Sequence, residues 1–254
     1  MRTTNRTFSW TGLVAVMLIC LLGTGAASGD EYFCPSGDTP CLIAAIDAAN
    51  ADGDEDIITL EEGVYTLTAE WNGDIYGDLV IDGNGATIER TASAPKFGIF
   101  NTGSTIEFRE LTIRGGHSPS QGGGIFNYAF LRLRDCIVED NRVDDDGAGI
   151  YNAGSLHLLR TTVRANVGPR GGGITNEPDA YALIEDSVID SNEGGTDGAF
   201  NNDGTMDFVN STISRNSAPS DCMYCYGAGA GYHCEANFRN VTIIRNTGKF
   251  VGGI

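Results

Sequence analysis

The feature that most constrains this chain is a repeat of about 25 residues that runs from its middle to its end. An apolar residue next to a glycine-rich stretch recurs at intervals of 26, 25, 24 and 26 residues. These positions are Ile99, Ile125, Ile150, Ile174 and Phe200, with Ala230 as the expected continuation. A repeat of this length is typical of a solenoid, in which each unit buries its apolar side against the next.

A second element keeps the same interval and ends in asparagine, with Gly116 in that place in the first unit. The asparagines are Asn141, Asn166, Asn192, Asn216 and Asn246. The apolar residues three positions earlier are Ile113, Val138, Val163, Ile189, Ile213 and Ile243. We expect these asparagines to be structural, because Asn tolerates left-handed turns and stacked amides can hydrogen-bond from unit to unit.

Each unit also holds alternating apolar residues, such as Ile106 and Phe108, and its strand-like stretches are separated by glycine or asparagine. Alternation predicts strands, and glycine runs such as 122–124 exclude the helix that many leucine-rich repeats carry. The sequence therefore predicts an all-β fold, a right-handed parallel β-helix, over residues 57–254. Its last residues begin another coil, so we expect an uncapped or truncated C-terminal end open to end-to-end self-association.

The N-terminal part divides into two segments. Residues 1–28 carry a basic start, an apolar run and small residues, which predicts a signal peptide and a secreted or cell-surface protein. Residues 29–56 are expected to form a cap, with a helix over 40–50 that has Thr39 as its N-cap and Pro40 at its first position. Export permits disulfides, so we expect Cys34 to pair with Cys41.

The cap sequence PCLIAAIDAAN, followed by DIITLEEGVYTLT and LVIDGNGATI, resembles the amino-terminal cap of secreted bacterial β-helix proteins of the pectin-lyase-like class, including the CSLREA-type proteins. The later units, such as Gly122-Gly123-Gly124-Ile125, are similar to the repeats of polymorphic outer-membrane proteins. The resemblance covers residues 34–254. It implies the β-helix fold and leaves many functions open.

The acidic residues give no clear catalytic constellation. The chain has 34 acidic and 16 basic residues and a net charge of -18, which disfavours nucleic acid as a partner. The cluster 144–146 is expected to lie in a turn without a basic partner, and no catalytic residue is assigned. We therefore predict a non-catalytic surface or matrix protein without a cofactor or metal. The alternative is a polysaccharide lyase or hydrolase of the same fold, with calcium in the lyase case.

Binding is expected at a column of aromatic residues. If the isoleucine of each Gly-Ile-Phe/Tyr-Asn strand faces inward, then Phe100, Phe126 and Tyr151 face outward on consecutive coils and offer rings to carbohydrate or protein. Otherwise these rings stack on one another beneath a loop. Near the C-terminus, Cys222, Cys225 and Cys234 are expected to provide a disulfide rather than a zinc site. Cys136 falls in an inward column and is expected to be a buried free thiol.

Overall fold

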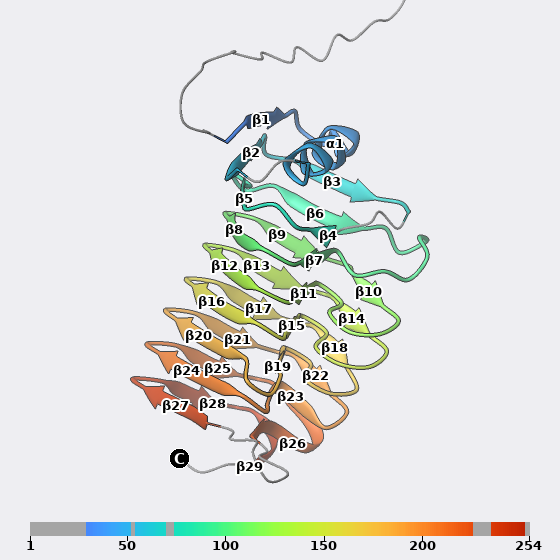
Figure 1. The fold of residues 1–254 in the computed structure, drawn as a ribbon. Helices are drawn as coiled ribbons and strands as arrows, with labels where there is room; N and C mark the ends of the chain where they lie inside the picture. Colours follow the sequence, from blue (N-terminus) through green and yellow to red (C-terminus); the bar gives the residue numbers. More distant parts are fainter. Residues whose placement is uncertain (1–28, 52–53, 70–73, 226–234, 252–254) are drawn as a thin grey trace, which may run out of the picture.

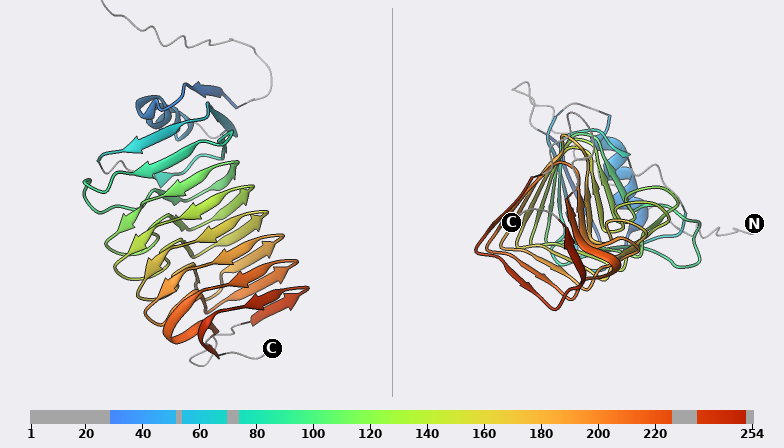
Figure 2. Two further views of the ribbon diagram at one scale, coloured as in Figure 1. Left: turned by 180° about the vertical axis from the view of Figure 1, so that it is seen from behind. Right: turned by 90° about the horizontal axis from the view of Figure 1, so that it is seen from below.

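The computed structural model describes residues 29–51, 54–69, 74–225 and 235–251. These residues form a parallel β-solenoid of about seven turns, with about 25 residues in each turn (Figure 1). Every strand pairing in the described residues is parallel. The view along the axis in Figure 2 shows the strands stacked as faces around a common interior. The fold is the parallel β-helix that the repeat predicts.

Sheet A is nine-stranded in the described residues. Its strands, in spatial order, are β1 (Glu31–Cys34), β2 (Asp56–Leu60), β5 (Leu79–Asp82), β8 (Thr105–Arg109), β12 (Phe130–Arg134), β16 (Ser155–Leu159), β20 (Tyr181–Glu185), β24 (Thr205–Val209) and β27 (Glu235–Arg239). Sheet B is eight-stranded over the same part of the chain. It contains β3 (Val64–Leu67), β6 (Thr87–Arg90), β9 (Thr112–Arg114), β13 (Ile137–Glu139), β17 (Thr162–Arg164), β21 (Val188–Asp190), β25 (Thr212–Ser214) and β28 (Thr242–Ile244).

Sheet C has two stacks of strands that share β26 (Ser217–Cys225). The first stack is β10 (His117–Ser118), β14 (Arg142–Val143), β18 (Val167–Gly168) and β22 (Glu193–Gly194). The second is β4 (Asp74–Ile75), β7 (Phe100–Thr102), β11 (Ile125–Asn127), β15 (Ile150–Asn152), β19 (Ile174–Asn176) and β23 (Asp197–Asn202). β29 (Thr247–Val251) also pairs with β26.

The predicted inward column of sheet B is confirmed. Val138 pairs with Ile113 on one side and with Val163 on the other, and the column continues through Ile189 and Ile213. These side chains are buried, whereas Ile243 in the last strand of the column is 42% exposed. Burying an aliphatic side chain of this size contributes about 1.5–3 kcal/mol before conformational entropy is subtracted. The column is therefore a main source of cohesion between coils.

The predicted register of sheet C is wrong at both ends. Phe100, and not Ile99, pairs with Ile125, so Phe100 faces the interior, where it is 1% exposed. Its ring lies 4.8 Å from the ring of Phe108. At the other end, Phe200 pairs with Met223 after an irregularity in the register. Ala230, the expected partner, lies outside the described residues.

The five predicted asparagines form a ladder, buried at all positions but the last. Asn141 Nδ2 donates to Asn166 Oδ1 at 3.0 Å, and the same bond repeats through Asn192 and Asn216 to Asn246. Each Oδ1 also accepts a backbone N–H from the coil before it, as from Gly116 to Asn141 at 2.9 Å. The left-handed residue of this turn, however, is the one before each asparagine. That column is Gly115, Asp140, Ala165, Ser191, Arg215 and Arg245, with φ between 54° and 72°.

A second ladder lies at the corner where sheet C passes into sheet A. Thr102 Oγ1 donates to Asn127 Oδ1 at 2.9 Å, and amide-to-amide bonds of 2.7–2.8 Å continue through Asn152 and Asn176 to Asn202. The recurring asparagine at 127, 152, 176 and 202, the last residue of the repeated strings, was the sequence signal for this ladder. The two ladders fix the coils in register at two corners of the β-helix, because each amide satisfies buried polar groups of its neighbours.

The N-terminal cap consists of strand β1 and helix α1 (Thr39–Ala49), which cover the first coil (Figure 1). Pro40 lies in the first turn, as predicted, but the N-cap is Asp38 and not Thr39. The Asp38 side chain accepts the backbone N–H of Cys41 at 3.0 Å. Strand β1, which pairs with β2, was not predicted. Cys34 and Cys41 form a disulfide, with their Cα atoms 5.6 Å apart. It ties β1 to the start of α1.

Candidate functional site

The strongest cluster of exposed aromatic side chains lies at the corner where β4, β7, β11 and β15 end. Ile75 and Asn127 both pair with Thr102, so Tyr76 and Tyr128 lie at the same step of their coils, with Gly103 between them. Phe126 and Tyr151 pair directly one step earlier, on β11 and β15. We call Tyr76, Phe126, Tyr128 and Tyr151 the corner platform.

Three rings of the corner platform, those of Phe126, Tyr128 and Tyr151, contact one another through Phe126. Phe126 stacks on Tyr128 with ring centroids 4.0 Å apart, and on its other side it lies 4.6 Å from Tyr151. Tyr76 and Tyr128 are 65% and 60% exposed, whereas Tyr151 is almost fully buried. Phe126 is half-buried between them. The platform thus has a packed floor and two exposed ring faces.

Gly103 has a steric role in the platform. A Cβ atom at this position would lie 3.0 Å from Cδ1 of Tyr76, so a side chain here would push that ring outward. The Tyr76 hydroxyl donates to Asp74 Oδ2 at 2.8 Å, and this hydrogen bond raises the pKa of Tyr76. Asn101 Nδ2 donates to the other oxygen of Asp74 at 2.8 Å. The backbone and a carboxylate together hold the Tyr76 ring in place.

The three predicted binding residues have different outcomes. Phe126 and Tyr151 lie together on the outer side of sheet C, although Tyr151 is covered by its surroundings. Phe100 is a core residue, so its predicted role was wrong; the register of β7 is shifted by one residue relative to the alignment of the Gly-Ile-Phe-Asn strings. Tyr128 was missed, although its position two residues after Phe126 places it on the same side of an extended chain. Tyr76 has no sequence signal, because the repeat is not visible before Ile99.

Polar groups border the platform on the side of Tyr151. Gln121 Nε2 donates to the Tyr151 hydroxyl at 3.3 Å. Burial raises the pKa of Tyr151, and so does its hydrogen bond to Glu177. Asp203 occupies the position in the next coil that corresponds to Glu177. The backbone N–H of Glu177 donates to the carbonyl of Asn152, and that of Asp203 donates to the carbonyl of Asn176, one coil further on. Burial, and then the nearby charge of Glu177, raise the pKa of Asp203.

The acidic cluster 144–146 has basic partners, contrary to the expectation from sequence. Asp144 accepts from Lys96 Nζ at 2.8 Å and contacts His117 Nε2 at 3.0 Å. These two hydrogen bonds lower the pKa of Asp144, the Lys96 bond more strongly. Lys96 comes from a loop two coils away, so its proximity cannot be seen in the repeat.

Asp146 is the buried member of the same cluster. It lies in register with Arg170 of the next coil, whose Nη2 donates to Asp146 Oδ2. Burial raises the pKa of Asp146 to about 6, although Arg170 opposes the shift. Asp146 Oδ1 has no hydrogen-bond partner among the described residues. The interior beside Tyr151 therefore contains a carboxyl group whose pKa lies well above the ordinary value for Asp.

Other predicted features have simpler outcomes. Cys136 is a buried free thiol, and burial raises its pKa to about 12. Cys234 lies outside the described residues, as do the side chains of Cys222 and Cys225. Within the described part of the chain, no group of three or more His, Cys, Asp and Glu side chains is arranged to hold a metal ion. The described residues also contain no helix that is long and apolar enough to cross a membrane.

Comparison with known proteins does not assign this chain to a family. No protein-family model matches the chain, and no curated protein matches its sequence.

Proposed function

We propose that this protein is an exported, non-catalytic β-helix that binds carbohydrate at the corner platform. The observation that carries the proposal is the Phe126–Tyr128 stack, since Tyr128 presents an exposed ring face and Tyr76 lies at the same step two coils away. Aromatic rings flanked by carboxylates and amides suit sugar rings, which have apolar faces and hydroxyl edges. Asp74, Asn101 and Glu177 supply such polar groups beside the rings.

Export is supported by the N-terminal sequence pattern, which lies outside the described residues, and by the Cys34–Cys41 disulfide. The resemblance of the cap to secreted β-helix proteins of the pectin-lyase-like class agrees with this proposal. A surface or matrix location suits a long, rigid scaffold that presents one binding corner to its surroundings.

The test is binding of the mature protein to a panel of neutral and acidic oligosaccharides, followed by calorimetry on any that bind. Replacing Phe126 and Tyr128 with Ala should weaken binding at least tenfold, because the stacking surface is lost while the core is untouched. Phe33→Ala is the matched control, since Phe33 is an exposed aromatic on the cap, 63% exposed and remote from the corner. Equal losses in both variants, or no saccharide binding at all, would contradict the proposal.

A polysaccharide hydrolase is the second candidate function. Glu177 and Asp203 lie one coil apart beside the platform, and burial together with the charge of Glu177 raises the pKa of Asp203, the direction that a general acid requires. Slow release of reducing ends from a bound glycan near pH 5, abolished in Asp203→Asn with binding retained, would establish this activity. Unchanged product formation in that variant would exclude Asp203 as the acid.

A further inference from the structure

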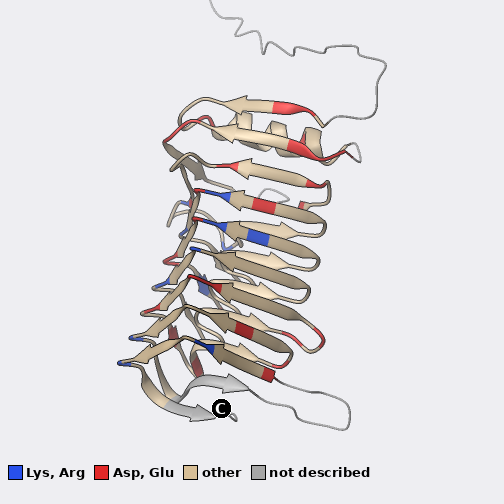
Figure 3. Ribbon diagram, turned by 90° about the vertical axis from the view of Figure 1, so that its left-hand side faces the viewer, with Lys and Arg blue, Asp and Glu red and all other residues tan. Residues whose placement is uncertain are grey.

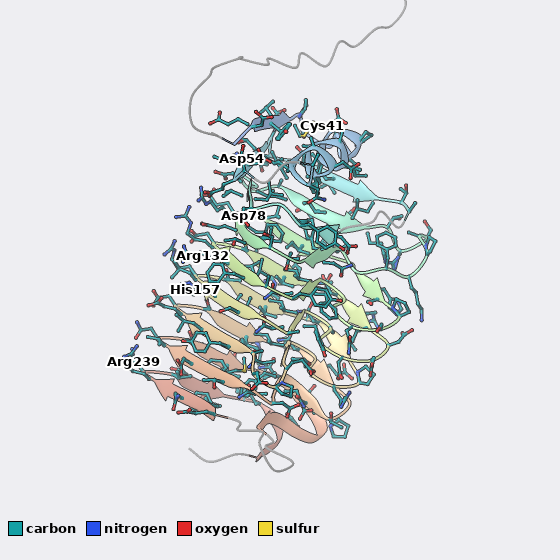
Figure 4. All side chains as sticks on the ribbon, viewed as in Figure 1. Cys41, Asp54, Asp78, Arg132, His157 and Arg239 are labelled. Carbon is teal, nitrogen blue, oxygen red and sulfur yellow. A yellow bond between two sulfur atoms is a disulfide. The ribbon has the colours of Figure 1, made fainter. Side chains whose placement is uncertain are left out.

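The outer face of sheet A has a cluster of arginines in an otherwise acidic protein. Register places Glu107, Arg132 and His157 in one outward column on successive coils. Arg109 and Arg134 lie beside them in the next outward column. Figure 3 shows basic and acidic residues on this face, and Figure 4 shows Arg132 and His157 on neighbouring coils, at the left-hand side of the molecule in that view. We call Arg109, Arg132 and Arg134, together with His157, the arginine patch.

The carboxylate of Glu107 lies near three guanidinium groups of this patch. Glu107 accepts from Arg109 Nε at 2.7 Å, while the nearest approaches of Arg134 and Arg132 to Glu107 are 3.7 and 3.9 Å. The hydrogen bond from Arg109 and the charges of all three arginines lower the pKa of Glu107. Arg132 and Arg134 remain 41% and 40% exposed at their side chains. Glu107 therefore cannot neutralise all the positive charge around it.

Two nitrogen atoms of the patch lack partners among the described residues. Arg132 Nε and His157 Nε2 are both shielded from solvent; the first donates no hydrogen bond and the second takes part in none. The nearest carboxylate oxygen to His157 Nε2 belongs to Glu185, at 3.5 Å. By contrast, Arg160 at the edge of the same face donates two hydrogen bonds to Asp135, at 2.7 and 2.8 Å. Because these two nitrogen atoms are shielded, the donors that the patch can offer to a ligand are those on the exposed parts of the Arg132 and Arg134 side chains.

Aromatic rings flank the patch. The Arg132 guanidinium lies 5.8 Å from the centroid of the Phe130 ring, and Phe130 is 37% exposed. Tyr181 occupies the same outward column two coils further on, with the small Ser155 between them. Phe130 also follows the corner platform by only two residues, so the two surfaces adjoin across the corner.

We propose that the arginine patch binds the sulfate ester of a sulfated saccharide. A tetrahedral oxyanion accepts hydrogen bonds in several directions and matches donors from the exposed side chains of Arg132 and Arg134, whereas a planar carboxylate is satisfied by one bidentate arginine. The inference rests on the proposed function in so far as the ligand is a saccharide. It extends that function by assigning the charged group that the ligand carries.

The remaining charges on this face do not cancel the patch. Asp135 is engaged by Arg160, Asp82 and Glu55 act on Arg109, and Glu185 lies 3.5 Å from His157 Nε2. Among the described residues, none of these four carboxylates forms an ion pair with Arg132 or Arg134. The net charge of the whole chain opposes the approach of an anion over long range. At physiological ionic strength, however, charges more than about 8 Å away are largely screened, so contact with the arginines decides affinity.

The experiment measures binding by calorimetry for four probes: inorganic sulfate, a sulfated oligosaccharide, its desulfated counterpart and an oligouronate. We expect the sulfated oligosaccharide to bind more tightly than the desulfated one and the oligouronate. Arg132→Gln and Arg134→Gln should each weaken its binding about tenfold, as expected for one charge-assisted hydrogen bond. Arg239→Gln is the matched control, because Arg239 lies in the same outward column as Arg134, four coils further on, and its substitution removes the same charge.

The outcomes separate the two proposals. If desulfation has no effect, or if Arg239→Gln weakens binding as much as Arg134→Gln, the oxyanion site is refuted while the corner platform stands. If the oligouronate binds as tightly as the sulfated probe, the ligand is a carboxylate and the sulfate assignment is overturned. If inorganic sulfate shifts the His157 ring resonances in the wild type but not in Arg132→Gln, and no saccharide binds, the oxyanion site stands and the carbohydrate proposal fails.

Discussion

The buried carboxyl group of Asp146 lowers the stability of the folded protein when it is ionised. Its carboxyl is buried between coils beside Tyr151, and burial raises its pKa to about 6 in spite of Arg170. In the unfolded chain the same group titrates near pH 3.9. The folded state therefore binds this proton more tightly than the unfolded state, and stability from Asp146 falls as pH rises from about 4 to about 6.

Asp146→Asn should remove this loss. Relative to the wild type, the free energy of unfolding of the variant should rise by about 2–3 kcal/mol between pH 4 and pH 7, since each pKa unit corresponds to about 1.4 kcal/mol. Asp145→Asn is the control, because its side chain is 54% exposed and lies next in the chain. Urea unfolding across this pH range measures both. A flat difference between Asp146→Asn and the wild type would show that Asp146 is not protonated preferentially in the folded state.

Individual residues also show where prediction from sequence fails. The Gly-Ile-Phe-Asn string at 98–101 looks identical to the one at 124–127, yet it is shifted by one residue in the sheet. Because side chains alternate in a strand, this shift moves Phe100 from the surface to the core. Nothing local distinguishes the two strings; the register is set by packing against Ile125 and Phe108, which only the assembled coils provide.

At the level of elements, the asparagine ladder was predictable as a column but its geometry was not. The repeat alone shows that an asparagine recurs, and burial of a polar side chain requires partners. The left-handed φ, however, falls on the preceding residue, which includes Asp140, Ala165 and Arg215. Such varied residue types give no sequence signal. The strain of a left-handed turn is accepted because the ladder asparagine fixes the backbone on both sides of it.

Asn166→Ala should cost roughly 3–5 kcal/mol of unfolding free energy. Asn166 Oδ1 accepts from the backbone N–H and the amide of Asn141, while its Nδ2 donates to Val138 and Asn192. The substitution leaves several buried groups unpaired, at about 1–3 kcal/mol each, with partial relief by relaxation. Asn237→Ala is the matched control, since its amide bonds to Asp207 on the exposed face of sheet A. If chemical denaturation showed that the two variants lose similar unfolding free energy, a ladder asparagine would contribute no more to stability than an exposed one.

The described residues form a stack in which the strands of each coil pair only with those of neighbouring coils, and contacts such as Lys96–Asp144 reach two coils, so its stability is approximately a sum over coils and interfaces. This quasi-linear architecture is why the fold class could be predicted from the repeat alone. The binding surfaces could not be predicted in the same way. The corner platform joins Tyr76, from before the recognisable repeat, to Tyr128, and the arginine patch depends on Arg109, Arg132 and Arg134 sharing Glu107 across two coils. Both arise from contacts between coils that differ in sequence.

The stack predicts that the same substitution has different effects at different heights of one column. Val163→Asp places a charge in the fully buried middle of the sheet B column, and Ile243→Asp places it in the last described strand of that column, at a position that is 42% exposed. The first should destabilise the protein by roughly 4 kcal/mol or more, because the carboxylate has no partner in an apolar interior. The second should cost about 1 kcal/mol, since water still reaches the site.

Hydrogen exchange should show loss of protection spreading from the mutated coil to its neighbours in Val163→Asp, and confined to β27 and β28 in Ile243→Asp. Equal effects at the two positions would contradict a nearest-neighbour stack and indicate that the coils unfold as one cooperative unit.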